Sequence, residues 1–141
     1  MTRMTSECIE QIKEHFSAFT DDFCIRHVLT SRWPTGMRCP QCGKESPRFL
    51  ENQKAWECNG GHSRARFSLR IGTVMEGSYV SVKKWLILIS LLRDRRRTST
   101  RDLAKILEVN QKTAWFMMDR FREAEIESRL WVPPSLPASP E

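Results

Sequence analysis

Apolar residues recur with a helical period in three parts of the chain. They fall three or four positions apart between residues 5 and 18, and again between about residues 21 and 30. Between residues 81 and 93 they cover most of a helix circumference, which indicates a helix enclosed on several sides. The expected N-caps are, in chain order, Ser6, Thr20 or Asp21, and Ser81.

The pattern changes to strict alternation at residues 64–70. Basic or polar side chains at 64, 66, 68 and 70 alternate with apolar ones, which predicts a half-buried strand with a basic outer face. Arg66 and Arg70 on that face are candidates to lie along a phosphate backbone. The alternative is a solvated ribbon edge whose charges resist aggregation. The pattern favours neither reading.

Residues 101–118 have the pattern of a helix-turn-helix. Glu108 and Val109 are the expected turn, although glycine is common at the position of Glu108, and Asn110 is the expected cap of the second helix. The N-terminal residues of such a recognition helix reach base edges in the major groove. The candidate readers are Gln111, Lys112, Thr113 and, against a thymine methyl group, Phe116. The alternative is a plain helical hairpin with a polar face.

Charge is distributed unevenly along the chain. The net charge is +6, and residues 38–72 carry seven basic residues against three acidic ones, while residues 80–125 carry eleven against six. Such an excess favours a polyanionic partner. The candidate phosphate contacts in the second segment are Arg95, Arg96, Arg97 and Arg120. Every apolar run is too short to span a membrane, and we expect no membrane partner.

Four residues have the spacing of a zinc ribbon. Cys39 and Cys42 form one knuckle, and Cys58 and His62 form a second. Fifteen residues, 43–57, separate Cys42 from Cys58. The expected set is Cys3His around one Zn²⁺ ion. Four protein ligands leave no open position, so the predicted zinc is structural.

Other uses of the cysteines fit less well. The alternatives are ordinary reduced thiols and an extracellular disulfide pair. The five cysteines are an odd number, and the N-terminus lacks the apolar run of a signal peptide, so we expect a chain in the reducing cytoplasm. There, clustered Cys and His residues are better explained by metal binding than by disulfides. Cys24 and His27 lie at helical spacing, but Cys24 is expected to be a small buried side chain and not a ligand of a second metal site. Metal binding by Cys8 and His15 is not expected either.

The predicted fold class is mostly α with a small β zinc ribbon. The expected units are N-terminal helical support (residues 1–36), zinc ribbon (37–76), a three-helix helix-turn-helix domain (77–126) and a proline-rich tail (127–141) that is disordered or a linker.

The combination of these motifs resembles one family. Over roughly residues 10 to 125 the chain is similar to the N-terminal region of the ISXO-like insertion-sequence transposases, whose eukaryotic relatives are the Merlin transposons. The segments that carry the resemblance are residues 33–43, the second knuckle, residues 66–76, residues 84–86 and residues 111–115. His62 departs from the second cysteine that is more usual there.

The resemblance implies recognition of duplex DNA, in particular the terminal inverted repeats of a mobile element. In that family a following RNase H-like domain cuts and joins DNA. This chain has a proline-rich tail at that point, so we expect a DNA-binding protein that is not an enzyme. We expect it in the cytoplasm with the nucleoid, or in the nucleus of a eukaryote. The alternative is a protein-interaction adaptor, and a homodimer or a larger protein partner stays open.

Overall fold

The computed structural model describes residues 4–51, 54–94, 98–127 and 130–140. In these ranges the chain forms five helices and a three-stranded antiparallel sheet of order β1-β2-β3, which confirms the expected fold class. The elements are α1 (Ser6–Ser17), α2 (Asp21–Arg32), β1 (Arg48–Leu50), β2 (Ala55–Glu57), β3 (Arg66–Phe67), α3 (Val82–Arg93), α4 (Thr100–Leu107) and α5 (Gln111–Glu127).

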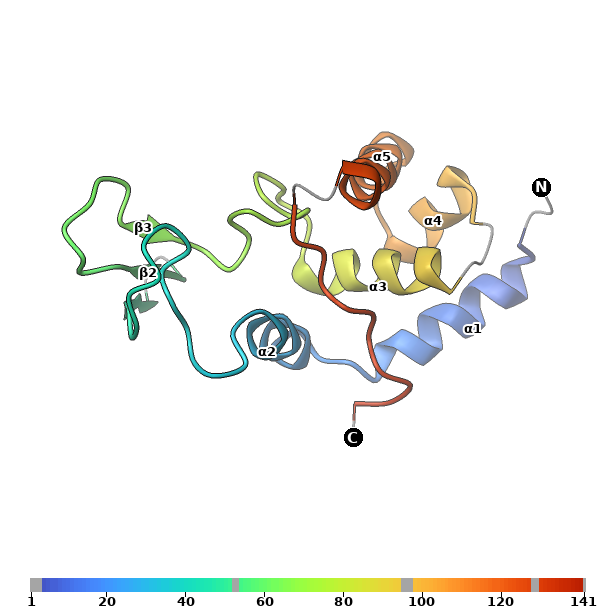
Figure 1. Ribbon diagram of the computed structural model, residues 1–141. Coiled ribbons are helices and arrows are strands. Elements are labelled where there is room, and N and C mark those ends of the chain that lie inside the picture. The colour runs from blue at the N-terminus through green and yellow to red at the C-terminus, as the bar shows by residue number, and fades with distance from the viewer. Residues whose placement is uncertain (1–3, 52–53, 95–97, 128–129, 141) are drawn as a thin grey trace.

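The helices surround α3, and the sheet lies to one side of them (Figure 1). Trp85, Leu86 and Leu88 of α3 are almost completely buried, as the apolar circumference of this helix predicts. The helices share one apolar core, while the buried residues of the ribbon form a second, much smaller core. The two parts therefore depend on different sources of stability.

The helix starts follow the capping residues closely. The side chains of Thr20 and Ser81 accept hydrogen bonds from backbone N–H groups three residues on, which confirms both as N-caps. The first helix begins differently, because Thr5 and not Ser6 accepts the N–H of Cys8. The second helix continues to Arg32, two residues beyond the expected end.

The expected strand at residues 64–70 is much shorter in the structure. Only Arg66 and Phe67 pair with β2, and there the alternation holds, with Phe67 buried and Arg66 exposed. Arg64 has a φ of 54°, and the N–H of Arg70 donates to the hydroxyl of Ser68, so turns replace the strand at both ends.

Residues 130–140 of the tail pack on the helical part of the chain, whereas the sequence predicted a disordered segment or a linker. Trp131 donates its N–H to Gly72 and accepts the N–H of Val74, and Leu136 donates its N–H to the hydroxyl of Ser90 at 2.9 Å. The tail runs across α3 (Figure 1), where Leu130, Trp131, Val132 and Leu136 pack on the main core. This part of the sequence has no helical or strand periodicity because the segment packs as an extended chain.

Arg32 joins the ribbon to the helices. Its guanidinium lies 4.5 Å from the ring centroid of Trp33 and 5.7 Å from that of Trp131, and it donates to the carbonyl oxygen of Leu69 at 3.0 Å. One side chain thus contacts the end of α2, the tail and the exit from the ribbon.

Glu108 has a left-handed backbone conformation at the end of α4. Its φ of 56° and ψ of 46° are left-handed, a conformation that costs a residue other than glycine about 1–2 kcal/mol. Its carboxylate lies 3.2 Å from Nζ of Lys13, an exposed pair of small value. We expect Glu108→Gly to raise the free energy of unfolding by about 0.5 kcal/mol, because the relief exceeds the added chain entropy.

The matched variant Glu108→Val should lower the free energy of unfolding by about 1 kcal/mol, because β-branched residues tolerate positive φ poorly. Urea unfolding of both variants checks the prediction. A valine variant as stable as the glycine variant would contradict the assigned turn.

Candidate metal centre and nucleic-acid interface

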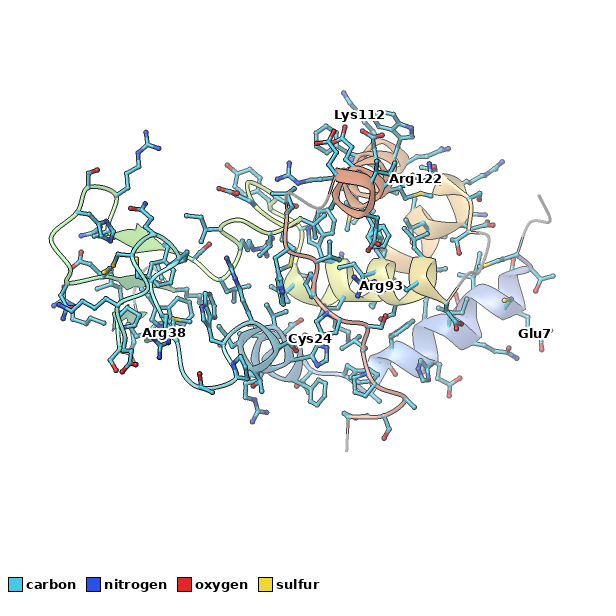
Figure 2. The ribbon with its side chains drawn as sticks, in the orientation of Figure 1. Glu7, Cys24, Arg38, Arg93, Lys112 and Arg122 are labelled. Atoms are coloured by element: carbon cyan, nitrogen blue, oxygen red, sulfur yellow. The ribbon has the colours of Figure 1, made fainter. Side chains whose placement is uncertain are left out.

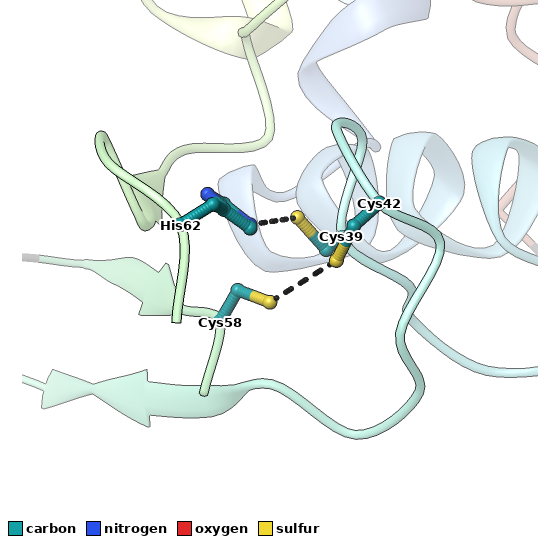
Figure 3. A group of neighbouring side chains, drawn as sticks. All are labelled: Cys39, Cys42, Cys58 and His62. Carbon is teal, nitrogen blue, oxygen red and sulfur yellow. Dashed lines mark hydrogen bonds between the residues drawn. The ribbon is translucent and has the colours of Figure 1, made fainter. Parts of the chain in front are cut away.

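The ribbon brings its four predicted ligands together from two loops. Cys39 and Cys42 follow α2, Cys58 comes directly after β2, and His62 lies in the turn that leads to β3 (Figure 3). The N–H of Gly43, which has a φ of 74°, donates to the carbonyl oxygen of Cys39 and closes the first knuckle.

The distances between these ligands suit a tetrahedral zinc ion. Sγ of Cys39 lies 3.3 Å from Nε2 of His62, Sγ of Cys42 lies 3.5 Å from Sγ of Cys58, and all four ligand atoms lie within 4.8 Å of one another. Zinc–sulfur bonds of about 2.3 Å place ligand atoms of a tetrahedral site about 3.8 Å apart. The cluster therefore fits one structural zinc ion, as predicted from the spacing.

Backbone groups prepare the ligands for a cation. The N–H groups of Gln41 and Gly60 donate to the sulfurs of Cys39 and Cys58. Burial raises the pKa of Cys39, but the N–H groups of Cys42 and Gln41 and the ring of His62 outweigh it and lower that pKa to about 6. These hydrogen bonds favour the thiolate form of Cys39, which is the form that binds zinc.

The imidazole of His62 is oriented by its neighbour. Its Nδ1–H donates to the carbonyl oxygen of Ser63 at 2.8 Å, which leaves Nε2 facing the sulfurs. This bond, together with the nearby Cys39 thiolate, raises the pKa of His62 to about 9 in the absence of metal. Such an outer hydrogen bond fixes the tautomer that binds zinc.

Gly60 leaves room for the sulfurs. A Cβ atom there would lie 3.2 Å from Sγ of Cys58 and 3.3 Å from Sγ of Cys42. We expect Gly60→Ala to weaken zinc binding about tenfold, because the crowded sulfurs must shift. Competition with a chromophoric chelator measures the affinity, with Asn59→Ala as the control in the same loop. Equal affinity of all three proteins would contradict the ligand geometry.

The remaining cysteines stand apart from the cluster. Among the described residues, the one group of three or more potential ligands is the Cys3His cluster. Cys24 is fully buried in the main core, and burial raises the pKa of its thiol to about 11. This confirms Cys24 as a buried apolar side chain, and Cys8 also packs against that core.

The predicted reading residues lie at the start of α5. Residues 108–110 connect α4 to α5, and the side chain of Asn110 accepts the N–H of Thr113 at 2.8 Å, as expected of the cap. Gln111, Lys112 and Phe116 are exposed, and Thr113 is half-buried. Lys112 lies at the outer edge of the molecule (Figure 2).

The predicted phosphate contacts have different surroundings. Arg66 is exposed and donates to the carboxylate of Glu57 at 3.1 Å. Arg70 and Arg120 are half-buried, and they donate to the carbonyl oxygens of Ser78 and Val74 at 3.0 and 2.7 Å. Their guanidinium groups therefore hold the segment between the ribbon and α3. The predicted contacts Arg95, Arg96 and Arg97 lie outside the described residues.

Sequence reasoning missed Tyr79. The side chain of this residue is 104% exposed, just before α3. A signal for it was available in the sequence. The one tyrosine of the chain lies between Ser78 and Ser81, where no apolar period requires an aromatic side chain.

Comparison with known proteins bears on the ribbon. Residues 19–62, which hold all four ligands, match the model of the transposase zinc-ribbon domain. The chain is also 30% identical over 99 residues to a protein of Halobacterium salinarum named "Uncharacterized protein in transposable element ISH50". This match covers 66% of the chain and 32% of the relative, so the chain spans about a third of that protein's length. No solved structure matches.

These findings establish a transposase-type zinc ribbon within the chain. They fit the resemblance drawn from the motifs as far as the ribbon extends. In the part of the chain that the structure describes, no helix has the length and apolar character to cross a membrane.

Proposed function

We propose that this chain is a zinc-stabilised module that binds duplex DNA and is associated with transposition. The observation that carries the proposal is the joint presence of a transposase-type zinc ribbon and an exposed, basic start of α5 behind a three-residue turn. In this proposal Gln111, Lys112 and Thr113 read base edges, and the ends of a mobile element are the expected target.

The charges along α5 support an approach by its N-terminal end. Residues 111–116 contain one lysine and no acidic residue. The second half of the helix, residues 119–127, has four acidic residues against two basic ones, and one of the acidic residues, Glu125, is paired with Arg93. A phosphate backbone is repelled by that half and attracted by the first turns, where the helix dipole is also favourable. The nearby Glu108 is paired with Lys13.

The half-buried arginines have another part in the proposal. Because Arg70 and Arg120 already donate to backbone carbonyls, we assign them to the support of the interface and not to phosphates. Among the described arginines of the ribbon, Arg66 and Arg48 share Glu57 and lie on exposed strands, where they can reach a second part of the duplex.

We propose binding, and not catalysis, for these 141 residues. The cluster in the described residues consists of thiolates and an imidazole, the ligands of closed structural zinc sites. Strand cleavage by two-metal chemistry uses carboxylates that converge from a folded scaffold.

Selection from a random duplex library tests the proposal. Zinc-loaded protein is used for the selection, and the winning duplex and a scrambled control are then titrated at two salt concentrations. We expect a preference of about a thousandfold for the winner and a steep loss of affinity with salt. Weak, equal binding to all duplexes would overturn the proposal and favour an adaptor that binds other proteins.

A further inference from the structure

An apolar groove lies beside the proposed reading residues. It has a volume of about 360 Å³ and runs between residues 76–80 and the first half of α5. Tyr79 and Phe116 line it with exposed aromatic rings, and the buried side chains of Trp85 and Met117 also line it. Lys112 and Thr113 form its border on α5, so the groove is continuous with the face that we assign to DNA.

The groove presents aromatic rings to solvent. Phe116 is 61% exposed and Tyr79 is completely exposed. Exposed apolar surface that gathers in one groove is typical of a binding site, whereas single exposed apolar side chains are ordinary. Flat rings beside a cation suit an aromatic, anionic ligand in particular.

The segment that carries Tyr79 is fixed and not a loose loop. The carbonyl oxygen of Ser78 accepts a bond from Arg70 at 3.0 Å, and its hydroxyl accepts the indole N–H of Trp85 at 3.0 Å. The N–H of Val80 donates to the same hydroxyl at 3.1 Å. The backbone on both sides of Tyr79 is therefore held in place, which lowers the entropy cost of ordering this segment when a ligand stacks on the ring.

We propose that this groove holds one unpaired nucleobase of the bound DNA. The inference rests on the proposed function and extends it to a substrate with an opened base pair. The base would stack on Tyr79 and Phe116, while its phosphate lies near Lys112. An apolar segment of another protein in the groove would compete with the duplex for Lys112 and Thr113 at its border. An extruded base would not compete, because it is part of the duplex.

Single mismatches test the inference on the selected duplex. A mismatch is placed in turn at each position across that duplex and one step beyond it. We expect one position, or two adjacent ones, to tighten binding about tenfold, because the protein no longer has to open that pair. 2-Aminopurine at this position should change its fluorescence when the protein binds.

Variants at Tyr79 identify the groove as the cause. Tyr79→Ala should lose the tenfold gain and still bind the fully paired duplex within about threefold of the unchanged protein, since the side chain is completely exposed and its loss leaves the fold intact. Tyr79→Phe should keep the gain because it keeps the ring. Phe49→Ala is the control, because Phe49 is an aromatic residue on the ribbon that is 49% exposed. It should leave both the tenfold gain and the affinity for the paired duplex unchanged.

The outcomes separate the two proposals. If no mismatch tightens binding, or if Tyr79→Ala keeps the gain, the base-binding inference is overturned while the paired duplex still demonstrates DNA binding. If the unchanged protein binds neither paired nor mismatched duplex, both proposals are overturned.

Discussion

Cys42→Ser is expected to release zinc and to unfold the ribbon while the helical part stays folded. Bound zinc should fall from about one equivalent to near zero, because a serine hydroxyl is a poor replacement for a thiolate ligand. Amide exchange of residues 38–72 should lose its protection. Protection of α3, α4 and α5 should persist.

The separation of the two cores is the reason for this selective effect. The small core contains Cys39, Cys58 and Phe67 as its buried residues, so two of its three members are metal ligands. Trp33 and Trp56, which are themselves only partly buried, pack against this core. So little apolar burial cannot order the ribbon, and zinc binding, worth about 10–16 kcal/mol in zinc-finger peptides, supplies the stability.

Cys8→Ser is the matched control, since it removes a thiol that lies outside the cluster. It should keep one equivalent of zinc. Zinc content is measured by metal analysis after gel filtration, and exchange by mass spectrometry. A Cys42→Ser protein that retains one equivalent of metal would refute the ligand set, and loss of protection in α3 would refute the independence of the two cores.

The sequence was sufficient to predict the features that depend on residues close together in the chain. The spacing of Cys39 and Cys42 and of Cys58 and His62 predicted a cluster that the structure confirms, because each knuckle is closed by local backbone turns. Caps at Thr20, Ser81 and Asn110 were predicted for the same reason. The error at Ser6 is one position, because Thr5 has an equivalent hydroxyl.

The sequence was insufficient where a feature depends on distant contacts. Arg120 reads as a surface cation of α5, but it donates to Val74, 46 residues away. Leu136 belongs to a tail without periodicity, and it is fixed by Ser90, also 46 residues away. No local pattern encodes such pairs, so the order of the tail and the supporting role of Arg120 could not be predicted from the sequence.

These distant contacts also link the proposed DNA-binding surfaces. The tail residue Trp131 contacts Gly72 and Val74, and Arg120 of α5 contacts Val74 as well. Residues 72–74 are thus bonded to both α5 and the tail at the point where the chain leaves the ribbon. The relative placement of ribbon and α5 is fixed by these bonds together with Arg32.

Lys112→Glu is expected to weaken binding of the selected duplex by about tenfold to a hundredfold. Lys112 is exposed at the start of α5, and its replacement puts a negative charge where the helix faces phosphates or base edges. The slope of log affinity against log salt should also fall by about 0.9 if the lysine neutralises one phosphate. Fluorescence anisotropy at four salt concentrations measures both quantities.

Arg26→Glu is the matched control because it changes the net charge by the same amount. Arg26 is exposed on α2, which lies on the other side of α3 from α5 (Figure 1). It should weaken binding less than threefold and leave the salt slope unchanged, since a charge beyond about one Debye length is screened. Both variants should melt within about 2 °C of the unchanged protein, because exposed charges contribute little to stability.

The comparison of these two variants decides between two modes of DNA binding. In one, the positive charge of the whole surface attracts the duplex, and in the other, the duplex is held at the start of α5. A general positive field predicts equal losses for Lys112→Glu and Arg26→Glu, because each removes two units of charge from the whole molecule. A duplex held at the start of α5 predicts a large loss for the first and a small one for the second. Equal losses would remove α5 from the interface and leave the ribbon, with Arg48 and Arg66 on its exposed strands, as the part that binds DNA.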